Sequence, residues 1–424
     1  MERRAAQRRL GVPASLLAGG LLLAACASGG AVGTARHTTT PARLATTGSS
    51  DAALPIPTLA VTPADGATGV TLDTPIKVTV DTGIIDRVVL HSDADPTALP
   101  GTLSPDGRAW TLNGPLDFGS HYVVAASAHD LGGGATASAG FTTIPVPTGA
   151  TRLTTDVAPG DGATVGVGMP IILKFNAAIA PDKQADIISR IQVQTSTPIV
   201  GAWHWFGTQE VHWRPQDYWP SGTQVHVVAH FRGATAGGGV WGLGDWSSSF
   251  TIGAKHVSII DAAAHQMQVF SGDQLIHTYP VSTGKPSSPT LSGTLFVWYK
   301  LQHVRMVSTS IGIPVNAAGG YDEQVLWDTA ISTDGFYIHS APWSVGSQGF
   351  VNVSHGCVNL SPARAIEFFN FSQPGDVVRV VNTARVADYS DGEADWQIPF
   401  AQYSNSGGVA QPAPTPTATG GGGL

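Results

Sequence analysis

Cysteine is nearly absent from this chain of 424 residues, which carries only Cys26 and Cys357. The two thiols lie far apart in the sequence, and each has a separate explanation. The cysteine count therefore predicts no disulfide framework.

Charged residues are also scarce. Asp, Glu, Lys and Arg make up 12% of the chain, the net charge is -8, and no basic run follows the N-terminal arginines. A protein that binds nucleic acid needs clustered basic residues to face the phosphates. This chain lacks such a cluster, so we expect no nucleic-acid partner.

Long uninterrupted helical segments are missing too. The 51 glycines and 29 prolines interrupt the chain every few residues, which favours short strands joined by turns. The length exceeds what one hydrophobic core usually serves. We therefore expect a mainly β protein with several domains.

Two segments of the chain repeat one another. The motif Val61–Thr68 recurs as Val157–Thr164 with the same Asp-Gly-Ala-Thr ending. The spacing of about 100 residues matches the length of one immunoglobulin-like sandwich. The repeat predicts two tandem sandwiches, at residues 55–147 and 148–253.

The second repeat holds a dense aromatic cluster in which two histidines are interleaved. A surface that stacks on carbohydrate is one interpretation, and core packing is the favoured one, because aromatic side chains bury large areas at low entropic cost. The histidines lack partners at a metal-ligand spacing and are assigned to structure. The cluster comprises Trp203, His204, Trp205, Phe206, His212, Trp213, Tyr218 and Trp219.

The N-terminus is typical of a secretory signal, with four arginines, an apolar run from Leu10 to Ala25, and then Cys26. The run is too short to span a membrane comfortably. Leu-Ala-Ala-Cys26 resembles the bacterial lipobox, in which the cysteine is lipidated and becomes the first mature residue. The alternative is a plain signal peptide with an incidental cysteine. We expect a signal at 1–26, a flexible tether at 27–54, and a lipid-anchored protein on the extracytoplasmic face of the cell membrane.

The third unit, residues 254–383, begins with strand patterns, and a long irregular stretch from Lys300 to Leu326 follows. Such a stretch is usually a lid or substrate loop. Ser361 and Pro362 offer an N-cap and a first-turn proline for a short helix. Residues 384–403 carry enough apolar surface to dock on a domain, and residues 404–424 have the composition of a disordered tail.

A possible nucleophile lies in the third unit. Cys357 follows His355 by two residues and His339 by eighteen. A thiol is mostly protonated at neutral pH, so a nucleophilic cysteine needs an imidazole or a positive field. In a strand, His355 and Cys357 would point to one face, whereas His339 approaches only if the intervening loop folds back. The alternative is a buried structural cysteine beside two incidental histidines.

The string Ser354–Asn359, preceded by His339-Ser340, resembles the signature of the L,D-transpeptidases, whose catalytic module is called the YkuD domain. The match extends upstream to Gly320-Tyr321 and is closest to the mycobacterial and actinobacterial branch. That branch carries two immunoglobulin-like domains before the catalytic domain and an aromatic segment after it. The resemblance implies a β-rich catalytic domain with a short helix, and an enzyme that crosslinks peptidoglycan in cell-wall biogenesis.

The resemblance also implies roles for the site residues. Cys357 would attack a donor tetrapeptide stem, release D-Ala and pass the acyl group to the amine of a second stem, which gives a 3→3 crosslink. His339 would be the general base, oriented by Ser340, and His355 would stabilise the charged intermediate. The N–H groups of Gly356 and Cys357, with the Tyr321 hydroxyl, would hold the oxyanion.

The implied contacts to the stem peptide involve Met306, Asp334, Gly335, Trp343, Ser354 and Asn359. Many family members carry Arg at the position of Asn359, so donor recognition is expected to be specific to this branch. Residues 233–244, where some relatives carry carboxylates that can hold a cation, contain none here, and we expect no metal and no cofactor. Carbapenems and other β-lactams are expected inhibitors.

Two alternatives to transfer stay open. An L,D-carboxypeptidase would hydrolyse the same thioester with the same residues. An inactive wall-binding lipoprotein is opposed by the intact His339, His355 and Cys357. The sequence leaves the acceptor amine and the oligomeric state undetermined.

Overall fold

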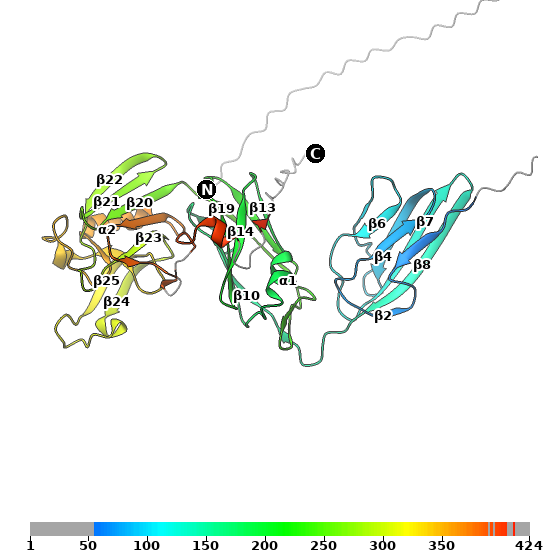
Figure 1. Ribbon diagram of the computed structural model, residues 1–424, viewed down its shortest axis with the longest axis horizontal. Coiled ribbons are helices and arrows are strands. Elements are labelled where there is room, and N and C mark those ends of the chain that lie inside the picture. Colours follow the sequence, from blue (N-terminus) through cyan, green and yellow to red (C-terminus); the bar gives the residue numbers. More distant parts are fainter. Residues whose placement is uncertain (1–54, 389–390, 393–394, 405–409, 412–424) are drawn as a thin grey trace, which may run out of the picture. The chain divides into compact units, whose positions relative to one another are not determined.

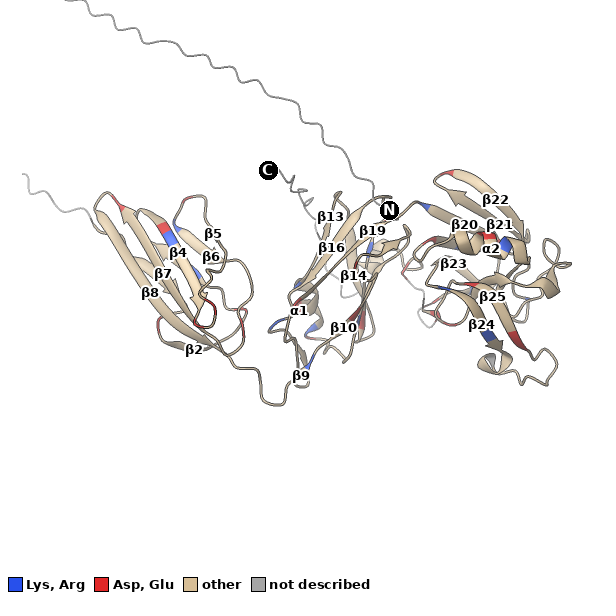
Figure 2. Cartoon of the chain, turned by 180° about the vertical axis from the view of Figure 1, so that it is seen from behind, with Lys and Arg blue, Asp and Glu red and all other residues tan. Residues whose placement is uncertain are grey.

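A computed structural model describes residues 55–388, 391–392, 395–404 and 410–411 (Figure 1). The predicted signal, the tether, Cys26 and nearly all of residues 405–424 lie outside the described residues. The predicted fold class is confirmed, because two tandem β-sandwiches precede a β-rich unit that contains one short helix. Charged residues are few and scattered over all three units (Figure 2).

The first sandwich consists of two four-stranded sheets around one core. Alternation along its strands explains the layering, since in His121–Asp130 every second residue from Tyr122 to Ala128 is buried. Trp110 and Phe141 lie in this core. The strand orders are β1 (Leu59–Thr62), β3 (Lys77–Val80), β6 (Ala109–Leu112), β5 (Gly101–Leu103) and β2 (Ala67–Val70), β8 (Gly133–Thr143), β7 (His121–Asp130), β4 (Ile84–Ser92).

The second sandwich has the same two-layer plan. Its sheets run β10 (Thr155–Ala158), β12 (Ile171–Phe175), β15 (Glu210–Pro215), β14 (Gly201–Phe206), β30 (Ala410–Gln411) and β11 (Thr164–Val165), β19 (Trp246–Ile252), β16 (Gln224–Ala229), β13 (Ile191–Thr195). A helix and a small sheet complete it: α1 (Gln184–Ser189), β17 (Thr235–Gly237), β18 (Val240–Trp241) and β9 (Thr151–Arg152).

The repeated motif forms the same hydrogen-bonded turn in both sandwiches. The Asp65 carboxylate accepts the N–H of Gly140 at 2.8 Å, and the Asp161 carboxylate accepts the N–H of Ser249 at 2.8 Å. The glycine after each aspartate has φ near +75°, which only glycine adopts readily. The repeat therefore marks one turn that ties the start of each sandwich to its last strand.

The aromatic cluster of the second sandwich is structural, as predicted. Trp203 and Trp213 are fully buried in its core, and Trp219 is nearly so. All six residues of β14 are buried, because residues 395–404, which include α3 (Phe400–Tyr403), contact the outer face of its sheet. There the Arg214 guanidinium lies over the rings of Trp396, Phe400 and Tyr403 at 4.6, 5.3 and 4.5 Å.

A buried histidine anchors this C-terminal segment. His212 Nδ1 lies 3.0 Å from the Asp395 carboxylate, and its Nε2 lies 2.9 Å from Glu210. Burial alone would lower the pKa of His212, but the two carboxylates outweigh it and raise the pKa to about 9. The imidazolium is thus charged at neutral pH and pairs the C-terminal segment to β15.

The third unit is built from two sheets around a helix, α2 (Pro362–Phe371), which contacts β25 and β26. Ser361 and Pro362 stand at the helix start as predicted. The six-stranded sheet runs β22 (Gln274–Pro280), β21 (Gln266–Ser271), β20 (His256–Asp261), β28 (Val377–Val381), β23 (Leu291–Phe296), β29 (Arg385–Val386). The four-stranded sheet runs β24 (Lys300–Val307), β25 (Asp322–Ala330), β26 (Tyr337–Ser340), β27 (Val358–Leu360).

The prediction of an irregular stretch from Lys300 to Leu326 is wrong at both ends of that stretch. Residues 300–307 form β24, which pairs antiparallel with residues 322–329 of β25. Alternation was hard to see there because β24 and the first half of β25 are largely exposed. Only residues 308–321 connect the strands irregularly, and this shorter segment carries Tyr321.

Candidate active site

Parallel pairing of β26 with β27 brings the strand of the predicted base next to the segment that carries the thiol. Ile338 pairs with Val358 and His339 pairs with Asn359. Cys357 directly precedes β27 and lies beside the start of β26, where the Tyr337 N–H interacts with its sulfur. The loop folds back as the sequence required, as the crossover that two parallel strands need.

The Cys357 thiol is protonated in this environment. It is partly buried, and its Sγ donates to the carbonyl oxygen of Gly335 at 3.7 Å. Burial raises the pKa of Cys357 to about 12, the charge of Asp328 adds to the rise, and the Tyr337 N–H opposes it. At neutral pH the sulfur therefore needs a base before it can attack.

His339 is suited to be that base. Its side chain is buried, and its Nδ1 lies 2.9 Å from the carbonyl oxygen of Ser340. A carbonyl can only accept, so Nδ1 carries the proton and Nε2 is left with a lone pair. Burial lowers the pKa of His339 to about 4, against the effect of the Ser340 carbonyl. The imidazole is thus neutral, and the backbone of Ser340 fixes its tautomer.

His355 differs from the sequence expectation. Residues 354–357 form a bend before β27 rather than a strand, so the argument from alternate residues does not hold. The reason is Gly356, whose φ of +131° breaks the extended chain. A side chain at this glycine would also meet the ring of Phe336 at 2.7 Å. The turn directs His355 to Lys285, whose Nζ lies 2.8 Å from its Nε2.

The Lys285 contact fixes the state of His355. An ammonium can only donate, so Nε2 of His355 accepts and Nδ1 carries the proton. Burial lowers the pKa of His355, and the positive charge of Lys285 lowers it further. The imidazole is therefore neutral, and the cation nearest to it is the lysine.

The predicted oxyanion donors are not equally available. The N–H of Gly356 donates to Ser354 Oγ at 3.1 Å, and this hydroxyl donates to the Cys357 carbonyl at 2.6 Å. The Gly356 amide is thus occupied in this state. The Tyr321 ring lies 5.2 Å from the ring of His355, and burial and the charge of Cys357 both raise its pKa. Tyr321 therefore lies beside the thiol with its hydroxyl protonated.

The predicted substrate contacts fall into two groups. Asn359 and Ser354 are buried and hydrogen-bonded within the site, Asn359 to Ser344 Oγ at 3.0 Å. Trp343 is exposed, with its ring 6.1 Å from that of His339. The other three lie at the edges of the sheet: Met306 on β24, with Asp334 and Gly335 in the turn before β26.

Sequence reasoning missed a loop, residues 284–290, that forms hydrogen bonds with the turn at residues 354–357. Gly284 bridges to Ser354, and the Lys285 N–H donates to the Ser354 carbonyl at 2.9 Å. Thr290 Oγ1 accepts the Gly284 N–H and donates to the Gly356 carbonyl at 2.6 Å. The Thr-Gly-Lys-Pro segment was visible in the sequence as a loop, but no local signal links it to residues 70 positions away.

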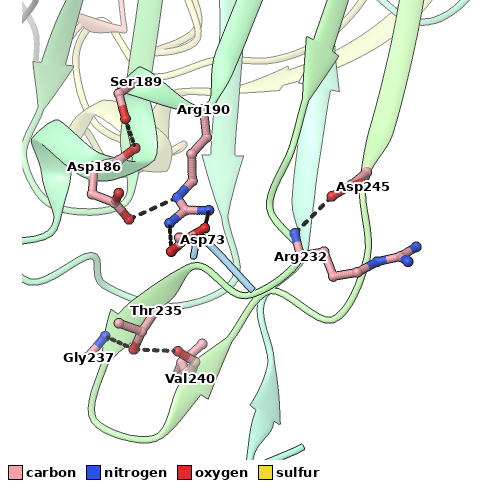
Figure 3. Close-up of polar contacts among 9 residues, drawn as sticks. All are labelled: Asp73, Asp186, Ser189, Arg190, Arg232, Thr235, Gly237, Val240 and Asp245. Atoms are coloured by element: carbon pink, nitrogen blue, oxygen red, sulfur yellow. Dashed lines mark hydrogen bonds and ion pairs between the residues drawn. The ribbon is translucent and has the colours of Figure 1, made fainter. Parts of the chain in front are cut away.

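Residues 233–244, where some relatives carry carboxylates that can hold a cation, form a segment held by hydrogen bonds. The Arg232 N–H donates to Asp245 at 2.8 Å, and Thr235 Oγ1 donates to the Val240 carbonyl (Figure 3). Within the described residues, no group of three or more His, Cys, Asp or Glu side chains could hold a metal ion. In that same part of the chain, no helix has the length and apolar character to cross a membrane.

Known proteins resemble this chain along most of its length. Residues 67–235 match the family model of a bacterial Ig domain, and residues 255–380 match that of the L,D-transpeptidase catalytic domain. L,D-transpeptidase 2 of Mycobacterium tuberculosis (strain CDC 1551 / Oshkosh) is 38% identical over 85% of this chain and 87% of its own. L,D-transpeptidase 5 of Mycobacterium tuberculosis (strain ATCC 25618 / H37Rv) is 33% identical over 86% of this chain and 80% of its own.

Solved structures match about half of the chain. One of an L,D-transpeptidase in complex with imipenem is 33% identical, with a TM-score of 0.48, over 54% of this chain and 99% of that one. One from Mycobacterium smegmatis is 32% identical, with a TM-score of 0.46, over 55% of this chain and 100% of that one.

The contact between Lys285 and His355 predicts a measurable pKa change. In Lys285→Met the ammonium that favours the neutral ring is lost, so the pKa of His355 should rise. An NMR titration of the ring proton signals, assigned with His355→Gln, measures it. Lys183→Met, which removes a lysine paired with Asp182 in the second sandwich, is the matched control and should leave the pKa unchanged. If Lys285→Met also leaves it unchanged, the contact does not exist in solution.

Proposed function

Because this chain belongs to the L,D-transpeptidase family, we propose that it forms 3→3 peptidoglycan crosslinks through a thioester on Cys357. The observation that carries the proposal is the parallel pairing of β26 with β27, which brings the segment of the protonated thiol next to the strand of a neutral His339. A nucleophile and a base of matched protonation state are what acyl transfer requires.

The first half of the reaction acylates the enzyme. His339 Nε2 takes the proton of the Cys357 thiol as the sulfur attacks the carbonyl carbon between the third stem residue and the terminal D-Ala. The C–N bond breaks, the nitrogen takes the proton back from His339, and D-Ala leaves. This sequence leaves a thioester and a neutral imidazole, so no cofactor is needed.

The second half resolves the thioester. The side-chain amine of the third residue in a second stem attacks the thioester carbon while His339 accepts its proton. The C–S bond breaks, the sulfur takes the proton from His339, and a new amide joins the two stems. In the hydrolytic alternative, water attacks in place of the amine, and the same residues carry both outcomes.

The negative oxygen of each tetrahedral intermediate needs donors. We assign this role to the Tyr321 hydroxyl and the Cys357 N–H, since Ser354 occupies the N–H of Gly356 in this state. Tyr321 lies close enough to feel the charge of Cys357. The Lys285 ammonium, in contact with His355, adds a fixed positive charge on the same side of the thiol.

The acyl-enzyme can be detected directly with a β-lactam. Imipenem presents a strained acyl group to the same nucleophile, so intact-mass spectrometry of the wild type should show one adduct with the mass of the drug. Cys357→Ala should show none. An equal adduct on Cys357→Ala, or no adduct on the wild type, would remove Cys357 from the mechanism.

A substrate then separates transfer from hydrolysis in the same preparation. Incubation with a disaccharide-tetrapeptide should yield a crosslinked dimer together with free D-Ala. Free D-Ala without dimer would assign the carboxypeptidase reaction. Neither product, from a protein that still binds imipenem, would leave only the wall-binding role.

We further propose that the protein is held outside the cytoplasmic membrane by a lipid on Cys26, which the arginines, the apolar run and the Leu-Ala-Ala-Cys string support. In a bacterial host, the wild type should fractionate with membranes and its N-terminal peptide should carry the lipid mass. Cys26→Ala should lose both properties. A wild-type chain with an unmodified Cys26 would contradict the proposal.

A further inference from the structure

A bulge in β25 lies directly opposite the proposed base. Leu326 pairs with Ser340 and Thr329 pairs with Ile338, so Trp327 and Asp328 together oppose His339 alone. Trp327 has φ of +59°, and its ring packs edge-on against Phe369 of α2 at 5.3 Å. Bulges often occur beside active sites, where they change the direction of a side chain. Here the residue that follows Trp327 in the bulge is Asp328.

Asp328 is an unusual residue for this position. Its side chain is fully buried, and neither carboxylate oxygen has a hydrogen-bond partner among the described residues. A buried, unpaired carboxylate is so unfavourable that such a group normally keeps its proton. Burial raises the pKa of Asp328 to about 7, which lies within the physiological range.

The charged groups around Asp328 are engaged elsewhere. On β24, the Lys300 ammonium donates to the carbonyls of Phe369 and Ser372, and Arg305 pairs with Asp322. On α2, Glu367 accepts from Tyr279. The other titratable groups on the elements packed against β25 are His303 on β24, Tyr337 and His339 on β26, and Arg364 on α2.

The negative charge of the Asp328 carboxylate raises the pKa of the Cys357 thiol. When the carboxylate ionises, its negative charge acts on Cys357 and on Tyr337 and disfavours a second negative charge at either. The effect at Cys357 adds to that of burial. Among the described residues, no basic side chain forms a hydrogen bond with this carboxylate.

We propose that Asp328 is a pH-sensitive positioning residue that limits the formation of the Cys357 thiolate once its own carboxyl group has lost its proton. Below this ionisation the thiol faces a neutral acid, and the base can activate it. Above it, the carboxylate makes the thiolate less favourable, so the usual gain in thiol reactivity with rising pH is offset. This inference rests on the proposed nucleophile, Cys357.

The test compares pH profiles of Cys357 reactivity in the full-length protein. Alkylation with iodoacetamide, followed by peptide mass spectrometry that separates Cys357 from Cys26, measures the thiolate without any transpeptidation. In the wild type the rate should rise with pH in two stages separated by a shallower region near pH 7. Asp328→Asn should remove the shallower region, with a rate ratio to wild type near one at pH 5.5 and about tenfold at pH 8.5, since one pKa unit is a factor of ten.

The controls distinguish the proposed role of Asp328 from the proposed function of Cys357. Asp322→Asn, on the same strand but paired with Arg305 at the surface, should reproduce the wild-type profile. Asp328→Ala serves if Asp328→Asn does not fold, and the wild-type profile alone is decisive, because a single ionisation step would overturn the inference. Imipenem acylation over the same pH range should follow the alkylation profile. A normal imipenem adduct with superimposable profiles would reject the role of Asp328 and leave the proposed function intact.

Discussion

The parallel pairing of β26 with β27 is the constraint on which the site depends. It sets His339 against Asn359 and thereby holds Cys357, which directly precedes β27, near the strand of His339. The pairing also forces a long crossover, and that crossover is held at its start and at its middle. The Ala341 N–H donates to the Leu360 carbonyl at 2.8 Å, and the Gly349 N–H donates to the Val281 carbonyl at 2.9 Å. A shift in register by one residue would turn the thiol away from the imidazole.

Burial then decides the charge state of the pair. It lowers the pKa of His339 to about 4 and raises that of Cys357 to about 12, so the proton stays on sulfur at rest. A neutral resting pair avoids the desolvation of a buried ion pair. In the proposed reaction, negative charge arises only when a substrate carbonyl is attacked, and Tyr321 and Lys285 are the groups that would stabilise it. The site is therefore prepared for the transition state rather than for a stored thiolate.

Much of this organisation could be predicted from the sequence, and the reason differs from part to part. The sandwich repeat was visible because the turn at Asp65 and Asp161 uses the same residues twice. The turn at residues 354–357 was visible because Ser354, Gly356 and Cys357 lie within four consecutive positions and each serves a local need. The helix at Pro362 was visible because its start signals are local as well.

Other features depend on contacts between distant segments. Lys285 meets His355 across 70 positions, and Asp395 meets His212 across 183. The bulge at Trp327 and Asp328 exists only relative to the neighbouring strand. The strand ends of the 300–326 region were mispredicted because residues 300–307 and 322–326 are mostly exposed and lack the alternation that marks a half-buried strand.

The most direct test of the account is the rate of Cys357 acylation by imipenem in His339→Ala. The variant should fold normally, as judged by circular dichroism, and acylate about 10²–10⁴-fold more slowly than wild type at neutral pH, the usual loss for a general base. His303→Ala, which changes an exposed histidine on β24, should acylate at the wild-type rate. A wild-type rate in His339→Ala would contradict the role of His339 as the base and would move that role to His355.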